Sequence, residues 1–373
     1  MPPQPTAARL ARPPRDTRLD VMRGWMQVSI FVAHVGGSVF AWFIHAAWGL
    51  SDSSEQFIFL SGFTLGSVFA LKAARDGFPA ARADMMQRTR RLYVTHLTVF
   101  AMFAALVFAT GLHLIPGEVA RLHWTFLAEQ PWFAIPAAAA TLYQPAFMGI
   151  LPVFVWCMLL LPGFLWLTDR IGAWALLPPI LAYAGVQLGF WATPELFENG
   201  IAFDPLAWQL LYLTGVWFGR RALLAGAAVE RNPWLISGAV AVVAFGLWAR
   251  LIEHGAIPGP DLATAALMHK EGLALPRLLH ALSLAYLVAV LMPREARWMT
   301  TRAAQAMAAI GRHSLQVFCL GLFLAWGATN ALRLWPEEAA WLDPLVVGLG
   351  VVLLWGLAIA RDRRARRPRA AAA

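Results

Sequence analysis

The chain has 373 residues, of which 59% are hydrophobic and only 14% are charged, and its mean hydropathy is +0.59. A soluble domain carries about 25% charged residues, so this composition excludes a soluble globular protein and predicts an integral membrane protein with many spans. The formal net charge of +9 would suit a nucleic-acid-binding protein, but in a membrane protein it follows from the gathering of Lys and Arg on cytoplasmic loops.

The predicted fold is all-α and polytopic, with about ten transmembrane helices. Residues 1–17 are rich in Pro and Arg, which predicts a disordered cytoplasmic arm and no cleavable signal peptide. A transmembrane domain is predicted at 18–361, followed by a basic cytoplasmic tail at 362–373. The apolar segments, each near the roughly 20 residues that a helix needs to cross a bilayer, are predicted at 21–46, 56–72, 92–112, 147–168, 173–191, 205–219, 234–251, 277–292, 309–329 and 342–360.

The distribution of basic residues predicts the orientation of these spans. With the N-terminus in the cytoplasm, most of the 30 Lys and Arg residues fall on cytoplasmic segments, including the C-terminal tail. The positive-inside rule therefore predicts that both termini are cytoplasmic. On the other face, the apolar run 131–143 is too short to span and is predicted to be interfacial or re-entrant.

The first predicted span carries a stripe of polar residues. Arg23 and His34 are 11 residues apart, close to three helical turns, so they share a face and His34 lies ~16 Å above Arg23. In an apolar core ~30 Å thick, this places His34 near the midplane. A buried, hydrogen-bonded histidine is the plain structural alternative. Ionisable groups in a span are costly, however, and a neutral imidazole can act as a general base. We assign His34 and Arg23 to catalysis, and Asp20 on the same stripe to donor binding.

Asp52 and Glu55 open the second predicted span and, at positions i and i+3, share a helix face. Two interpretations stay open. In the first, Ser51 or Asp52 caps the helix, with Glu55 as the partner in a capping box. In the second, one carboxylate orients a catalytic histidine or binds a substrate hydroxyl. Both residues are counted among the catalytic candidates. Further along the same span, Gly62 and Gly66 form a GxxxG pattern, which predicts close helix packing.

Two basic groups are candidate binding sites. Arg88, Arg91 and His96 mark the inner end of the third predicted span, where they either anchor the helix in the inner leaflet or bind the phosphates of an anionic donor. Lys270, Arg277 and His280 stand at the outer end of the eighth predicted span. They are assigned to substrate binding, with loop solvation as the alternative. Cys157 and Cys319 have no neighbour at metal-ligand spacing, so no metal site is predicted.

These residues carry a resemblance to a known family. Arg23 and His34, with ten residues between them, resemble the R-x10-H signature of the acyltransferase-3 superfamily. FIFLSGF at 57–63 resembles its second-span motif FFxxSGF, and RTRRLYVTH at 88–96 its third-span arginine motif. Six ordered blocks resemble the OpgC branch of that superfamily, namely 16–24, 49–63, 142–155, 203–219, 276–288 and 310–321.

The resemblance implies a membrane O-acyltransferase of the bacterial inner membrane. It implies transfer of a succinyl or similar group from cytoplasmic acyl-CoA to hydroxyls of osmoregulated periplasmic glucans. It places the family's catalytic histidine at His34 and its arginine partner at Arg23. Acyl-CoA, with succinyl-CoA as the implied form, is a donor substrate and no bound cofactor is expected. Direct transfer and a covalent acyl-enzyme both fit the sequence. The alternative function is a transporter or flippase of a glycan or acyl-linked substrate that moves along the polar stripe.

Overall fold

The computed structural model describes residues 15–191, 200–262 and 264–370, and within these ranges the chain is helical without strands. The all-α prediction is therefore confirmed for the described part of the chain. The chain divides into two compact units. Unit 1 contains Ser61–Ala228 and Met268–Arg277, and unit 2 contains Pro14–Leu60, Val229–Leu267 and Leu278–Ala373.

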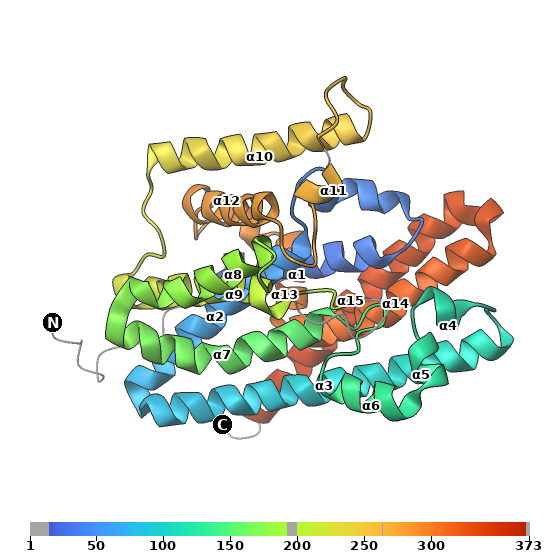
Figure 1. Cartoon of the computed structure of the whole chain (residues 1–373), viewed down its shortest axis with the longest axis horizontal. Helices are drawn as coiled ribbons and strands as arrows, with labels where there is room; N and C mark the ends of the chain where they lie inside the picture. Colours follow the sequence, from blue (N-terminus) through green and yellow to red (C-terminus); the bar gives the residue numbers. More distant parts are fainter. Residues whose placement is uncertain (1–14, 192–199, 263, 371–373) are drawn as a thin grey trace. The chain divides into compact units, whose positions relative to one another are not determined.

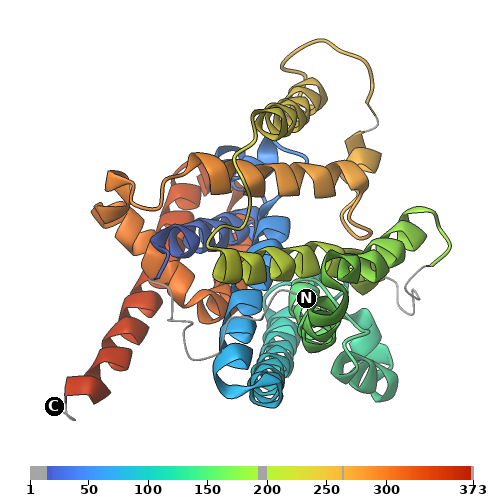
Figure 2. The same cartoon turned by 90° about the vertical axis from the view of Figure 1, so that its left-hand side faces the viewer.

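Unit 2 is built around α1 (Thr17–His34), which packs against α13 (Arg302–Arg312) and α14 (Ser314–Leu334). In Figure 2, the dark blue α1 lies beside the orange and red helices of this unit. The helix α15 (Ala339–Ala370) contacts α13 and α14. The other elements of this unit are η2 (Val39–Phe43), η3 (His45–Ala47), the start of α2 (Ser53–Asp76), α10 (Pro233–Glu253), α11 (Thr264–Leu267), most of α12 (Leu275–Leu291), η5 (Arg297–Thr300) and η6 (Pro336–Glu338).

Two glycines set how closely α1 and α13 approach each other. A Cβ on Gly24 would lie 1.9 Å from the carbonyl oxygen of Met307, and a Cβ on Gly311 would lie 1.9 Å from that of Asp20. The two backbones therefore touch where any larger residue would collide. Next to this contact, the apolar side chains of α1, α13, α14 and α15 form one core, which includes Phe31, Ile310, Val317 and Leu354.

Unit 1 is a second helical bundle. Figure 1 shows α3 (Phe78–His113) and α7 (Ile150–Ile171) side by side, and α7 and α8 (Leu177–Gln187) both contact α9 (Pro205–Ala225). The GxxxG prediction is confirmed, because a Cβ on Gly62 or Gly66 would collide with backbone oxygens of α9. The short elements of this unit are α4 (Glu118–Arg121), α5 (Thr125–Glu129), α6 (Pro131–Ala139) and η4 (Gly172–Leu176).

The span count is confirmed only in part. By length and composition, six candidate membrane spans occur among the described residues, at Ser53–Asp76, Phe78–His113, Ile150–Gln187, Pro233–Glu253, Ser314–Leu334 and Pro336–Arg364. Several apolar helices thus support a membrane protein, whereas ten spans are not confirmed.

Three predicted boundaries were wrong for identifiable reasons. The predicted span 21–46 is interrupted, because α1 ends at His34 and Gly37, with φ of +86°, turns the chain before two short 3-10 helices. The predicted span 309–329 breaks at His313, between α13 and α14. The third predicted span starts earlier, at Phe78, so the arginine motif lies inside a helix. Apolar periodicity does not mark these ends.

The predicted terminal segments and short apolar run can also be placed. Residues 1–14 of the predicted arm lie outside the described residues, and α1 begins at Thr17 with Asp16 as its N-cap. The predicted tail is not separated from the last helix, because α15 continues to Ala370. The run predicted at 131–143 forms α6, whose nine residues are too few to cross a bilayer.

Candidate functional site

The polar stripe of α1 begins with an ion pair at the start of the helix. Asp20 is 5% exposed and accepts hydrogen bonds from Nε and Nη2 of Arg15, the latter at 2.9 Å. These hydrogen bonds raise the pKa of the Arg15 guanidinium above its usual value. The negative charge of Asp20, a residue that the sequence assigned to donor binding, is thus balanced by the positive charge of Arg15 in the same chain.

Arg23 is the next residue of the stripe. Its Nη2 donates a hydrogen bond of 3.2 Å to the carbonyl oxygen of Leu60, which fixes the guanidinium to the first half of α2. Its Nε is buried and finds no hydrogen-bond partner among the described residues. A buried donor without a partner is costly, so this nitrogen is suited to bind a ligand acceptor.

His34 is the last residue of α1 and does not lie in the interior of a longer helix, as the predicted span required. Its Nδ1 is 2.6 Å from the carbonyl oxygen of Ile30. Since a carbonyl oxygen only accepts, Nδ1 carries the hydrogen, and in the neutral ring the basic lone pair is on Nε2. The geometry therefore prepares one defined nitrogen of His34 for general-base chemistry.

The end of α1 is held by a residue of α14. The Thr329 hydroxyl donates to the carbonyl oxygen of His34 at 3.2 Å and accepts from the N–H of Gly36 at 2.8 Å. This one side chain satisfies groups on both sides of the point where the helix stops. Thr329 therefore fixes the backbone that carries the imidazole.

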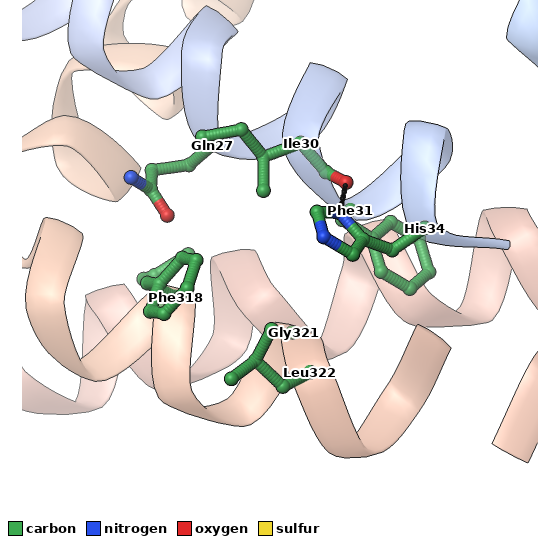
Figure 3. A pocket seen from close by; sticks show the side chains of 8 residues that line it. Gln27, Ile30, Phe31, His34, Phe318, Gly321 and Leu322 are labelled. Atoms are coloured by element: carbon green, nitrogen blue, oxygen red, sulfur yellow. Dashed lines mark hydrogen bonds between the residues drawn. The ribbon is translucent and has the colours of Figure 1, made fainter. Parts of the chain in front are cut away.

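A small cavity of about 10 Å³, with room for about one water molecule, lies between the stripe and α14. Figure 3 shows Gln27 and His34 reaching from α1 toward α14 residues, with Phe31 and Ile30 between them along the helix. Apart from Gln27 and His34 its lining is apolar or glycine, and it consists of Gln27, Ile30, Phe31, His34, Val317, Phe318, Gly321 and Leu322. Apolar walls with a few polar groups are the usual lining of a small-molecule site, but this cavity would have to widen to admit a ligand larger than water.

The carboxylates at the start of α2 form a capping box. The N–H of Ser54 donates to Oδ1 of Asp52 at 2.6 Å, and Oε2 of Glu55 accepts from the N–H of Asp52 at 2.8 Å. This is the reciprocal pattern that satisfies free N–H groups at a helix start. Glu55 is fully buried, which suits this role more than contact with a soluble substrate.

His280 is clamped beside that cap. Its Nδ1 is hydrogen-bonded to Oγ of Ser51 at 2.8 Å, and the ring is 2% exposed. A Cβ on Gly49 or on Gly246 would lie 2.7 Å from a ring carbon, so both positions need glycine to make room for the imidazole. His280 thus joins α12 to the segment before α2, and its predicted role in substrate binding stays a prediction.

A comparison with protein families identifies the family of the chain. The family model described as OpgC protein matches residues 15–366. The chain belongs to the OpgC family. The sequence resemblance to OpgC is thereby confirmed, and the family indicates a glucan-modifying role of the acyltransferase type. No curated protein and no solved structure matches the chain.

In this OpgC-family chain, the residues of α3 that were predicted to bind the acyl donor lie in unit 1 and have different surroundings. Arg88 and Arg91 are exposed, and Nε of Arg88 donates to Asp84 at 2.8 Å. Lys72 also lies 3.4 Å from that carboxylate. His96 is fully buried, and neither ring nitrogen has a hydrogen-bond partner among the described residues. The structure thus separates the buried His96 from the two exposed arginines, of which Arg88 is paired with Asp84.

The other predicted basic group of the OpgC-family chain is also divided. Arg277 is 3% exposed and donates to the carbonyl oxygen of Met268 at 3.1 Å. Nζ of Lys270 lies 5.4 Å from the centre of the Phe203 ring, within cation–π distance. With His280 held by Ser51, each of the three residues has contacts of its own, and their common role in substrate binding stays a prediction.

Three residues of the OpgC-family site escaped assignment from the sequence. Gln27 falls on the Arg23–His34 stripe, and its helical spacing is the signal that could have singled it out. Thr329 and Ser51 gave no such signal, because their partners lie far away in the sequence. Together, Asp20, Arg23, Gln27 and His34 form a stripe of buried and half-buried polar side chains that ends in an oriented imidazole at a small, mostly apolar cavity.

Proposed function

We propose that this protein is a membrane O-acyltransferase that moves a succinyl or similar acyl group from cytoplasmic acyl-CoA to hydroxyls of periplasmic glucans. The single observation that carries the proposal is the orientation of His34, whose Nδ1–H is given to Ile30 while the ring lines the cavity between α1 and α14. Membership of the OpgC family supplies the class of reaction.

The proposed reaction uses Nε2 of His34 as the general base. Nε2 accepts the proton of a glucan hydroxyl while the hydroxyl oxygen attacks the carbonyl carbon of the thioester. The new C–O bond forms, the C–S bond breaks, and the departing thiolate takes the proton back from the imidazolium. The step involves no oxidation or reduction, and the products are an acyl ester and free CoA. The Ile30 carbonyl stabilises the positive ring through its hydrogen bond during the step.

Other groups of the chain support the binding of the donor in this proposal. Arg88 and Arg91 are exposed arginines of the kind that pairs with phosphate oxygens, and we assign them to the phosphates of CoA. Arg23 offers, on the α1 stripe, an Nε for which the described part of the chain supplies no hydrogen-bond acceptor. We further propose that the protein lies in the inner membrane with both termini in the cytoplasm. The distribution of basic residues supports this orientation.

The test replaces His34 in the full-length protein. His34→Ala is expected to lower glucan acylation to about 1% or less of the wild-type level, because general-base catalysis contributes roughly 10²–10⁴ in rate. The measurement is mass spectrometry of periplasmic glucans from cells with equal amounts of membrane-inserted protein. His113→Ala is the matched control, since His113 is an exposed histidine at the end of α3 and should leave acylation unchanged.

Two results would contradict the proposal. Wild-type levels of acylation in the His34→Ala variant would show that the imidazole is not the general base of the reaction. Unchanged glucan decoration in cells without the gene, together with glucan retained in the cytoplasm, would favour the transporter alternative.

A further inference from the structure

Gln27 is the least satisfied polar side chain at the cavity. It is 2% exposed, and neither its amide nitrogen nor its amide oxygen has a hydrogen-bond partner among the described residues. Figure 3 shows its side chain extended from α1 over the space that Phe318 borders from α14. A complete amide group, with a hydrogen-bond donor and an acceptor, thus lines the cavity without a hydrogen bond to any described residue.

This arrangement has an energetic cost, because an unpaired buried polar group destabilises the folded state. The buried Gln56 and Gln209 donate to the carbonyl oxygens of Ala281 and Pro179 respectively. An apolar side chain at position 27 would fill the same space at less cost, so the amide is suited to a partner that the described residues do not supply.

The position of Gln27 indicates the kind of ligand. It lies four residues after Arg23 and seven before His34, all on one face of α1, so it stands ~6 Å above Arg23 and ~10 Å below His34 along the axis. A side-chain amide pairs best with another amide, because each group offers one N–H donor and one C=O acceptor. The other residues that line the cavity are apolar or glycine, and they would contact the methylene groups on either side of such an amide once the cavity widens to admit it.

We propose that Gln27 binds a secondary amide in the arm of the acyl donor, and so sets the depth at which the thioester reaches His34. This inference rests on the proposed function, in which the donor is acyl-CoA. The pantetheine arm of CoA joins its sulfur to the nucleotide through two secondary amides separated by methylene groups. A donor with its thioester at His34 and its arm running toward Arg23 carries these amides past Gln27.

The test measures binding without turnover. The probe is desulfo-CoA, which keeps both amides and cannot transfer an acyl group, titrated into the full-length protein in detergent. Gln27→Leu is expected to weaken its binding about 5–30-fold, the equivalent of one or two lost neutral hydrogen bonds. Binding of adenosine bisphosphate, the nucleotide part of CoA without the arm, is expected to be unchanged.

A stability measurement separates this role from a structural one. Gln27→Leu should raise the melting temperature of the ligand-free protein, because it removes an unpaired buried amide. Gln209→Leu is the matched control, since its amide is paired, and it should lower the melting temperature without changing desulfo-CoA binding. A drop in melting temperature for Gln27→Leu similar to that of the control would show that the amide already has a structural partner, such as a buried water.

The outcomes distinguish this inference from the proposed function. Equal desulfo-CoA affinity of the wild type and Gln27→Leu, in a wild-type protein that acylates glucan, overturns the role of Gln27 alone. A wild-type protein that binds neither desulfo-CoA nor adenosine bisphosphate overturns the acyl-CoA donor and the role of Gln27 together.

Discussion

At the scale of single residues, substitutions of Glu55 distinguish a catalytic carboxylate from a carboxylate that caps a helix. Its Oε2 accepts the N–H of Asp52, and its side chain is fully buried. Glutamine can replace glutamate in a capping box, because its amide oxygen also accepts this N–H. We therefore expect Glu55→Gln to keep both thermal stability and glucan acylation near wild type, whereas Glu55→Ala should lower stability by about 0.5–2 kcal/mol.

Thermal unfolding and acylation assays on the two Glu55 variants decide between the roles. A Glu55→Gln protein that folds normally but transfers acyl groups at least tenfold more slowly would show that the Glu55 carboxylate takes part in catalysis. Asp52 shares the cap through the N–H of Ser54, so its loss is expected to resemble that of Glu55→Ala.

At the scale of helices, the contact between α1 and α13 is the most sensitive to added volume. A Cβ at Gly24 would meet the Met307 carbonyl oxygen at 1.9 Å, and backbone cannot move aside as a flexible side chain can. Gly24→Ala is expected to lower the free energy of unfolding by at least about 1–3 kcal/mol, the usual cost of overpacking. It should also reduce acylation, because α1 carries Arg23 and His34.

The control for this prediction is Gly327→Ala in α14. Gly327 has open space around the position of a Cβ, so alanine adds no clash there. Because alanine favours the helix over glycine, this variant is expected to gain about 0.5–1 kcal/mol. A Gly24→Ala protein as stable as Gly327→Ala would contradict the close backbone contact. Thermal unfolding in detergent measures both.

At the scale of the whole molecule, the orientation in the membrane can be tested at the two ends of α10. Ala227 precedes this helix beside a cluster of arginines, and Ala256 follows it; both are exposed. The positive-inside rule places residue 227 in the cytoplasm and residue 256 outside. A membrane-impermeant thiol reagent should therefore label Ala256→Cys in intact spheroplasts, but Ala227→Cys only after lysis.

The wild-type protein is the control for this labelling experiment, because its own Cys157 and Cys319 lie within α7 and α14. The reverse pattern, with Ala227→Cys labelled in intact spheroplasts, would invert the proposed orientation. It would also place the exposed Arg88 and Arg91 away from cytoplasmic acyl-CoA, and so contradict their assignment to the donor.

The sequence by itself determined the class of the protein and the stripe on α1. Apolar composition and segment length are local properties, and they were enough to predict an all-helical membrane protein. The helical period is fixed, so Arg23, Gln27 and His34 had to share a face as soon as this segment was helical. The close approach at Gly62 and Gly66 followed for the same reason, because small residues four apart line one face.

Only the tertiary structure decided where that stripe ends and what surrounds it. The chain leaves the helix after His34 because Gly37 takes a positive φ and Thr329 binds the backbone on both sides of the break. The pairing of Ser51 with His280 and the cavity between α1 and α14 join segments hundreds of residues apart. A sequence pattern records which side chains share a helix face, whereas hydrogen bonds and cavities depend on which distant helices pack against that face.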